Sequence, residues 1–494
     1  MSKFRFLFII VSVQLLLFFN LPFKSNGQDF VVYSKNDVKK VLDEIRLSIE
    51  EVHPNPYHSI SKKEIDSLYR LSVLNLPDSL TEVELYKLLL PLVNSYNDGH
   101  IQLTCPFGKF INNGINENKG IFPFTLYQID DGIFIKISVF DEIVKPGYQL
   151  ISIDNIGIDN IINDYSKFKF GDNLTIRKRK AVEDFMALDF LVNSGKESYL
   201  IGYKKTANDS THFCTVNAAK MDDIIKFNSS FSPPQSIDYF LKSTIKLQNL
   251  VYLQLHPSMK VALLTLPSFD VSADLEKEYN QKIDSIFEYL KVAKIDTLLI
   301  DIRGNGGGQD FPSQFILNYI ASKDYCWGKA YFKRSSHQKR LYENMLKDKL
   351  SDSSYIRSSE YYNYFTANDG EIIELDSSVE KSKDEEFLYK GKVFVLISKD
   401  TYSAAITFAA ICQCFNFATI IGEETYGRTS TYTSLVPIYL SIPSLKFGVA
   451  HRMVINSCSK GFNIGLKPDI VIPRTHASYL TGKDDVIEYI LNSF

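Results

Sequence analysis

The stretch that decides the fold runs from residue 298 to residue 308 and reads LLIDIRGNGGG. An apolar run of strand character ends in residues that are Gly or Asn from Gly304 onward. Such residues let the backbone take left-handed angles and bring N–H groups close to a ligand, so this loop could hold an oxyanion. Taken alone, the loop fits a tight strand-to-helix turn better. A phosphate-binding role has even less support, because the stretch lacks a Gly-Lys-Ser/Thr ending.

A second stretch, residues 393–410, follows the same plan and reads VFVLISKDTYSAAITFAA. Ser403 enters the predicted helix with alanines behind it, which predicts an exposed hydroxyl that a substrate can approach closely. The helix dipole and the Ala404 N–H favour negative charge at this point. An ordinary helix-capping serine would have the same local sequence.

Around both stretches, strand-like runs alternate with helical ones, which indicates an α/β domain with helices packed on a sheet. The predicted strands cover residues 261–266, 297–300, 393–397 and 419–421. Helices are predicted around 274–293 and after residues 311 and 402. A lysine- and serine-rich insert between about 335 and 385 interrupts this pattern and is expected on the surface.

Residues 28–115 are predicted to form a mainly helical segment. Apolar residues recur at three- and four-residue steps up to Pro54, which indicates an amphipathic helix that ends at this proline. The ranges Ser61–Glu64 and Thr81–Glu84 have the spacing of capping boxes, which predicts two further helix starts.

Residues 116–216 are predicted to be a β-rich module, because apolar residues alternate with others from Ile133 to Val139. Residues 145–155 read KPGYQLISIDN, which resembles a turn–strand–turn segment of PDZ domains, modules that add a peptide to a sheet edge. Tyr148 and Ile156 depart from that pattern, so a PDZ-like module and a generic β-rich insert both stay open. Residues 217–246 show little periodicity and are predicted to be a linker.

The composition is that of a globular protein that can bury large cores. The chain has 494 residues, 45% of them hydrophobic, which suggests about three domains. Lys and Arg number 55 against 58 Asp and Glu, a net charge of -3. This balance argues against nucleic acid or an anionic membrane as the main partner.

Residues 1–27 are predicted to be a cleaved secretory signal. Lys3 and Arg5 precede an apolar run at 6–19, and small residues follow up to Gly27. An uncleaved membrane anchor is the alternative, but the run is shorter than the roughly 20 residues of a span. The protein is therefore expected in the periplasm or outside the cell, with no membrane contact beyond this signal.

The six cysteines lack the paired short spacings of a zinc site. Neither a metal nor another cofactor is expected. The cysteines are interpreted as buried small hydrophobic residues, with one or two disulfides as the less favoured alternative.

Motifs in a fixed order make the chain resemble family S41 of serine peptidases, which includes the tail-specific or C-terminal-processing proteases and the tricorn core protease. The motifs are NDGH at 97–100, residues 299–308, TYSAA at 401–405, IGEETYG at 421–427 and, more weakly, KPDI at 467–470. The resemblance covers residues from about 30 to 475. It implies a crotonase-like α/β protease core at 247–494, preceded by a PDZ-type module.

The resemblance also implies a reaction and the residues that perform it. A peptide bond of a polypeptide substrate would be hydrolysed through an acyl-enzyme on Ser403. The oxyanion hole would consist of the Ala404 N–H and an N–H of Gly306 or Gly307.

The base is where this sequence departs from one branch of the family. The processing proteases have a lysine in the Gly-Glu-Thr-Gly motif, but Arg428 follows Gly427 here, and a guanidinium cannot accept the serine proton. The tricorn branch uses a histidine from the N-terminal portion, which matches His100. His100 is therefore predicted to be the general base, with His451 as the reserve.

The residue that orients His100 stays open, with Asp98, Glu424 and Asp469 unranked. Gly99 stands where the tricorn protease has a serine, and no glutamate precedes Gly465 as the family often shows. Arg428 is a speculative partner for a substrate carboxylate. Two other functions remain as alternatives: a peptide-binding protein of the same fold that has lost catalysis, and a crotonase-type acyl-CoA enzyme.

Overall fold

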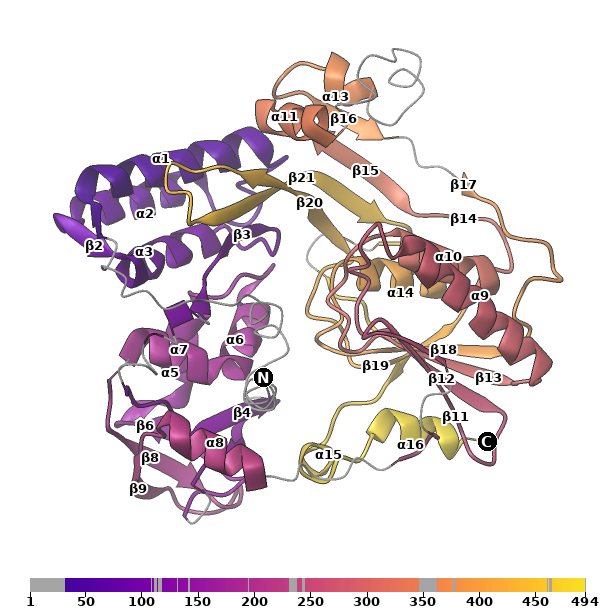
Figure 1. Ribbon diagram of the computed structural model, residues 1–494, viewed down its shortest axis with the longest axis horizontal. Coiled ribbons are helices and arrows are strands. Elements are labelled where there is room, and N and C mark those ends of the chain that lie inside the picture. The colour runs from indigo at the N-terminus through magenta and orange to yellow at the C-terminus, as the bar shows by residue number, and fades with distance from the viewer. Residues whose placement is uncertain are drawn as a thin grey trace.

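Figure 1 shows the computed structural model of the chain. It describes residues 32–107, 109–110, 113, 118–130, 132–140, 143–193, 195–230, 238–241, 245–345, 362–375, 379–459, 461 and 464–493. The predicted signal peptide at 1–27 lies outside these ranges. Within them, no helix is both long and apolar enough to cross a membrane.

A seven-stranded sheet organises the C-terminal half, in the order β10-β11-β12-β13-β18-β19-β22. The strands are β10 (Ile245–Leu247), β11 (Val251–Leu255), β12 (Val261–Thr265), β13 (Thr297–Asp301), β18 (Lys392–Ile397), β19 (Thr419–Gly422) and β22 (Ile470–Val471). From β12 to β22 neighbouring strands are parallel, whereas β10 and β11 pair antiparallel. The predicted α/β character is confirmed, and the carboxyl ends of β13 and β18 meet at one edge of the sheet, where α/β proteins place their sites.

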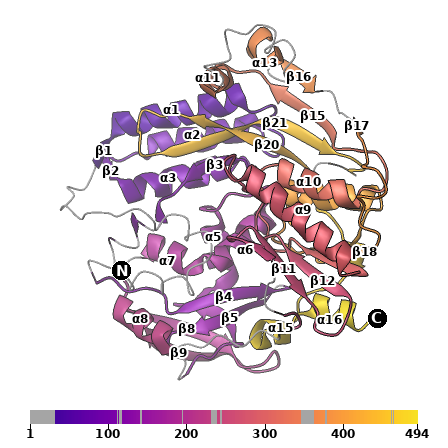
Figure 2. The same ribbon diagram turned by 45° about the vertical axis from the view of Figure 1, so that its right-hand side comes forward.

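Helices cover both faces of this sheet, so its strands are apolar on both sides. Leu298 and Ile300 of β13 pack in one core with α9 (Glu276–Val292), α10 (Phe311–Ile320) and α14 (Ala404–Cys414). Leu299, which points to the opposite face, packs in a second core with residues of α16 (Asp485–Leu491). Figure 2 shows α9 and α10 side by side on one face.

The predicted N-terminal helices are present as α1 (Lys35–Val52), α2 (Lys62–Leu74) and α3 (Glu82–Asn94), with short strands β1 (Val32–Ser34) and β2 (Ser79–Thr81). Both predicted capping boxes are confirmed at Ser61 and Thr81. These helices do not enclose a core of their own. Their apolar faces share one core with Val436, Phe447 and other residues from the C-terminal half.

A long antiparallel sheet links the two ends of the chain (Figure 1). Its order is β16-β15-β21-β20, and β3 also pairs with β21. The strands are β3 (Ile101–Thr104), β15 (Gly328–Lys333), β16 (Ile372–Leu375), β20 (Ser430–Ile438) and β21 (Lys446–Asn456). The insert predicted at 335–385 contributes β16, α11 (Ser336–Met345), α13 (Tyr362–Thr366) and β17 (Val379–Glu380), which pairs with β14 (Tyr325–Cys326).

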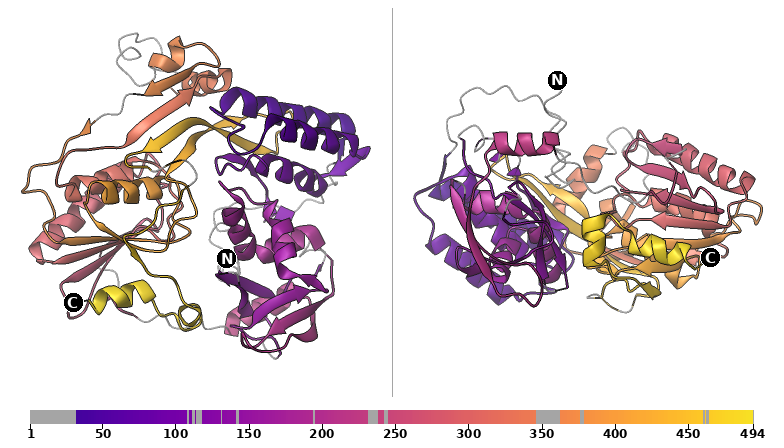
Figure 3. Two further views of the ribbon diagram at one scale, coloured as in Figure 1. Left: turned by 180° about the vertical axis from the view of Figure 1, so that it is seen from behind. Right: turned by 90° about the horizontal axis from the view of Figure 1, so that it is seen from below.

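The predicted β-rich module is a separate antiparallel sheet with helices against it. The strands are β4 (Phe124–Ile129), β5 (Gly132–Ser138), β6 (Gln149–Ile153), β7 (Ile156–Gly157), β8 (Ser198–Lys204) and β9 (His212–Asn217). The helices are α5 (Ile158–Ser166), α6 (Leu174–Glu183) and α7 (Phe185–Asn193). α15 (His476–Thr481) reaches this module from the C-terminal half, where the Tyr479 and Tyr127 rings stack at 4.5 Å (Figure 3, left).

Two predictions need correction. The segment at 217–246, predicted to have little periodicity, contains the helix α8 (Met221–Ser230), whose Ile224 is buried against the module. The interpretation of all cysteines as unpaired is wrong for Cys414 and Cys458, which form a disulfide with a Cα–Cα distance of 5.8 Å. Cys412 is buried and unpaired, and Cys105, Cys214 and Cys326 are partly buried and unpaired.

Candidate active site

Ser403 occupies a strained position at the start of α14. Its φ of 53° and ψ of -125° are unusual for a residue with a side chain. Its hydroxyl makes no capping hydrogen bond to the helix. Instead, Ser403 Oγ lies 3.3 Å from His100 Nε2. The helix-capping interpretation of this serine therefore fails, and the strained turn directs the hydroxyl toward His100.

His100 reaches Ser403 from the turn between α3 and β3. Its backbone N–H donates to Asp98 Oδ1 at 2.6 Å, and its carbonyl accepts a hydrogen bond from the Ala450 N–H of β21 at 2.9 Å. The side chain is buried, and the ring stacks on Tyr402 with the centroids 5.7 Å apart. His100 is thus held by β21 and by Tyr402, the residue before Ser403.

The glycine loop after β13 packs directly against the nucleophile. A Cβ on Gly307 would lie 2.7 Å from Ser403 Cβ and 3.0 Å from the Ala404 nitrogen, and Gly307 has a φ of +95°. The Gly307 N–H already donates to Asn305 Oδ1 at 2.8 Å. Gly306 has open space around it, with no atom within 4 Å of a Cβ built there. Of the two predicted oxyanion donors in this loop, Gly306 is therefore the better candidate.

Arg428 lies in the interior. Its guanidinium contacts His58 Nε2 at 3.1 Å and donates to the backbone carbonyl of Asp172. With its side chain buried and committed to these partners, Arg428 holds parts of the chain together at the site. This placement favours a positioning role over the predicted contact with a substrate carboxylate.

Comparison with known proteins agrees with this geometry. Residues 260–472 match the family model of peptidase family S41, and this segment contains Ser403 and the glycine loop. The chain carries a segment of the S41 peptidase type at these residues. Members of this family are serine-type peptidases, so the substrates of this chain are polypeptides.

Solved structures with a similar fold cover nearly the whole chain of this S41 peptidase. The crystal structure of mature CPAF has a TM-score of 0.63 at 14% identity and covers 93% of this chain and 97% of that chain. The structure of mature CPAF complexed with lactacystin has a TM-score of 0.60 at 14% identity, with 93% and 98% covered. At this identity the likeness concerns the fold alone.

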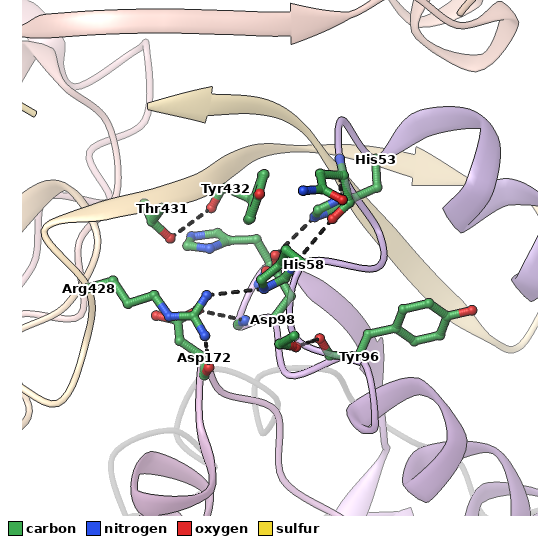
Figure 4. A network of polar contacts seen from close by, with 12 residues as sticks. His53, His58, Tyr96, Asp98, Asp172, Arg428, Thr431 and Tyr432 are labelled. Carbon is green, nitrogen blue, oxygen red and sulfur yellow. Dashed lines mark hydrogen bonds and ion pairs between the residues drawn. The ribbon is translucent and has the colours of Figure 1, made fainter. Parts of the chain in front are cut away.

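A buried network of polar side chains adjoins His100 through Asp98 (Figure 4). The Asn55 N–H donates to His53 Nδ1 at 3.1 Å, so the other ring nitrogen carries the proton and donates to Asp98 Oδ2 at 3.0 Å. Burial alone would raise the pKa of Asp98, but the hydrogen bond from His53 outweighs burial and holds the pKa below its usual value. Asp98 is therefore an anion with both oxygens occupied.

His58 is the second imidazole of this network. Its Nδ1 faces the Asn55 carbonyl at 3.1 Å and carries the proton, so its Nε2 accepts from Arg428. Burial lowers the pKa of His58, which keeps the ring neutral. Tyr432 packs against both rings, with its centroid 4.4 Å from that of His53.

Two sets of residues in this region have donor types that suit a cation: His53, His58 and Asp98, and Asp98, His100 and Asp172. In the first set, the donor atoms already serve hydrogen bonds within the network. A cation there would have to displace the Arg428 guanidinium. The first set therefore fits a hydrogen-bonding role better than metal binding.

Asp172 is a residue of the site that the sequence did not suggest. It lies in the loop between α5 and α6, is 1% exposed, and its Oδ1 accepts the Gly99 N–H at 2.9 Å. Gly99 is required here, because a Cβ would lie 1.8 Å from the Tyr402 hydroxyl. The only signal in the sequence was a Gly-Asp-Asn turn far from every recognised motif.

The remaining candidates lie elsewhere. His451 is buried in β21 and its Nδ1 bonds to the Ser434 carbonyl at 2.6 Å, so it faces a backbone turn. Glu424 is exposed, and Asp469 binds the Ile420 N–H and the Gln413 side chain. Asp301 and Arg303 brace a turn through their mutual ion pair.

Proposed function

We propose that this S41 peptidase is an exported serine endopeptidase that works through an acyl-enzyme on Ser403, with His100 as the general base. The observation that carries the proposal is the 3.3 Å distance between Ser403 Oγ and His100 Nε2, made by a serine in a strained turn. Strain of this kind persists at functional sites because the surrounding structure holds it.

The chemistry follows from that pair. As Ser403 Oγ attacks the scissile carbonyl carbon, His100 Nε2 takes the hydroxyl proton and then gives it to the leaving amine. In the second half, His100 takes a proton from water, whose oxygen attacks the acyl carbon, and returns it to Ser403. At the end of each half-reaction, His100 has the protonation state with which it started.

We assign the oxyanion hole to the Ala404 N–H and the Gly306 N–H. Ala404 is in the first turn of α14, where N–H groups lack helical acceptors and the dipole favours a negative charge. Gly306 faces open space, whereas the Gly307 N–H already donates to Asn305 Oδ1 within the loop. Loss of one such donor typically costs about 2.7–4 kcal/mol of transition-state stabilisation.

The test is covalent labelling of purified protein 28–494 by a fluorophosphonate probe, followed by digestion of an unfolded protein substrate. Ser403→Ala and His100→Ala are expected to lose labelling and digestion while keeping the fold. His212→Ala, a change at a partly exposed histidine in the module, is the matched control and should label like the wild type. Equal labelling of the His100 variant and the wild type would contradict the assigned base.

We further infer the domain division that the sequence suggested: a helical segment at 28–115, a PDZ-like module at 116–216, a connecting segment at 217–246 and a crotonase-like protease core at 247–494. The antiparallel sheet with edge strands β4 and β9 supports the module. The layered sheet between α14 and α16 supports the core. Limited proteolysis that releases a folded fragment near 116–216 would support this division, and cleavage only inside the sheets would contradict it.

Export is supported by the basic start and apolar run at 1–27, and by the Cys414–Cys458 disulfide, which suits an oxidising compartment. No nucleic acid, membrane or cofactor is required by the proposed chemistry. Expression of the full chain in a bacterium should give a periplasmic protein whose N-terminus is near Gln28. A cytosolic protein that retains Met1 would contradict export.

A further inference from the structure

Three buried polar atoms around His100 have no hydrogen-bond partner among the described residues. They are His100 Nδ1, Asp172 Oδ2 and the Tyr402 hydroxyl. A buried polar group without a partner costs about 1–3 kcal/mol, so such atoms call for a functional explanation. Three of them around one catalytic ring indicate that they belong to one arrangement.

The three atoms come from side chains that lie together. A ring nitrogen of His100 and carboxylate oxygens of Asp98 and Asp172 lie within 4.8 Å of one another. The Tyr402 hydroxyl and Asp172 Oδ1 both face the same side of Gly99. Burial, followed by the negative charge of Asp172, holds the pKa of Tyr402 well above its usual value, so this hydroxyl keeps its proton.

Asp98, the nearest acid in the sequence, is already committed. Its Oδ1 accepts the backbone N–H of His100, and its Oδ2 accepts the ring proton of His53. Asp98 thus fixes the backbone of the base and leaves the ring to another acceptor.

Asp172 is held in place for that role from two directions. Its Oδ1 is anchored by the Gly99 N–H, and its backbone carbonyl accepts from the Arg428 guanidinium. The next residue, Asn173, donates to the Tyr426 carbonyl at 3.3 Å. These contacts tie the loop to both sides of the site and leave Oδ2 without a partner.

We propose that Asp172 is the positioning residue for His100: its Oδ2 accepts the Nδ1–H of the ring, directly or through one water shared with the Tyr402 hydroxyl. This role rests on the proposed function. The acceptor fixes the tautomer in which Nε2 is free to take the Ser403 proton, and its charge stabilises the imidazolium that follows.

The proposal also explains Arg428, which stands where processing proteases have their lysine. The guanidinium cannot be a base, but it clamps the main chain of the loop that supplies the acid. The acid therefore comes from the loop between two helices of the module, while the nucleophile comes from the core and the base from the N-terminal segment. The site is complete only when the module, the core and the N-terminal segment pack against one another.

The kinetic test compares Asp172→Asn with Asp184→Asn in protein 28–494. Asparagine keeps an oxygen for the Gly99 N–H but removes the charge, so kcat on a peptide substrate should fall about 10²–10⁴-fold with little change in KM. Asp184 belongs to the same module and pairs with Lys169 at 2.6 Å. Its variant controls for loss of a buried ion pair and should change kcat less than about 5-fold.

A readout independent of turnover separates this inference from the proposed function. In the Ser403→Ala background, a hydrogen-bonded Nδ1–H of His100 should give a low-field proton resonance, identified by its loss in His100→Gln. The resonance should vanish in Asp172→Asn and persist in Asp184→Asn. Its persistence in Asp172→Asn would overturn the inference even if kcat falls.

If the wild type fails to turn over but the resonance follows Asp172, the proposed function fails and the positioning role stands. If Asp172→Asn does not fold, Asp172→Glu is the substitute variant. It keeps the negative charge but places the carboxylate one methylene group farther from the backbone. A displaced resonance in the glutamate variant supports the role, and an unchanged resonance overturns it.

Discussion

The backbone of Ser403 departs from the conformations that residues with side chains prefer, at a typical cost of about 1–3 kcal/mol. The turn is held by hydrogen bonds from the Ala405 N–H to the Tyr402 carbonyl and from the Ile406 N–H to the Ser403 carbonyl. Residue 307 approaches the same turn from the neighbouring loop. The nucleophile thus depends on a contact that only glycine permits.

Gly307→Ala should reduce the fluorophosphonate labelling rate at least about 100-fold, because the methyl group would press on Ser403 Cβ and on the Tyr402 carbonyl at 2.9 Å. The φ of +95° adds strain for any residue with a Cβ. Labelling rates of the two proteins at equal probe concentration measure the effect.

Gly304→Ala is the matched control from the same loop. Gly304 is exposed, and a Cβ there meets no atom within 4 Å. Its labelling rate should stay within about 3-fold of the wild type. Equal losses of labelling in both variants would show that side chains in this loop impair labelling for reasons other than contact with Ser403.

His451 leads to a prediction about acid stability. Burial, and then the charge of Arg452, lower the pKa of His451 to about 3 from its ordinary 6.5. The unfolded chain therefore binds one more proton than the folded chain between these values, so stability is full above pH 6.5 and is lost as the pH falls toward 3. His451→Gln should make the free energy of unfolding less sensitive to pH in this window, by on the order of 1 kcal/mol for each pH unit.

The measurement is urea unfolding at several pH values between about 7 and 5, compared as slopes because the substitution also alters packing. A His451 variant with the slope of the wild type would contradict the prediction.

The sequence was sufficient to pair Ser403 with His100 and to place the glycine loop beside them, because each belongs to a recognisable motif. It was insufficient for Asp172, since an acid that acts across domains leaves no local pattern. Arg428 shows the same limit: its chemistry excluded a base, but only the fold reveals which carbonyl the guanidinium holds.

At the scale of elements, local signals were reliable wherever a strand or helix is specified by its own residues. The capping boxes of α2 and α3 and the core strands β12, β13, β18 and β19 lie within a few residues of their predicted positions. β20 was missed; a late strand was predicted at His451, and β21 confirms it, but its contact to His100 was not predicted. β20 pairs with β21, and β21 also pairs with β15 and β3, which lie far away in the sequence; periodicity does not record such partners.

The capping box of α2 can be tested inside a single helix. Ser61 accepts the Glu64 N–H, and the Glu64 carboxylate accepts the Ser61 N–H at 3.0 Å. Ser61→Ala should destabilise α2 by about 1 kcal/mol, which corresponds to roughly 5-fold faster amide hydrogen exchange over 62–74.

Ser67→Ala is the control in the middle of the same helix, where the exposed hydroxyl only bonds back to the Lys63 carbonyl. Alanine is a better helix former, so exchange there should be unchanged or slower. Faster exchange in both variants would mean that the capping box contributes nothing specific.

At the scale of the whole molecule, both ends of the chain and its middle are needed for one site, and β21 connects them. It pairs with β3, which follows His100, and it ends close to Cys458. The Cys414–Cys458 disulfide joins the end of α14, the helix that begins at Ser403, to the segment after β21. One covalent bond therefore ties the helix of the nucleophile to the sheet that holds the base.

Reduction of this disulfide should lower the free energy of unfolding by about 2–4 kcal/mol, since the bond closes a loop between positions 44 apart and restricts the unfolded chain. The melting temperature with and without a thiol reductant measures the effect, and Cys414→Ser should have a low melting temperature under both conditions.

Thiol titration of the denatured protein is the independent check. Of six cysteines, four should react before reduction and all six after it. Six reactive thiols before reduction would show that the bond does not form, and would also weaken the case for export to an oxidising compartment.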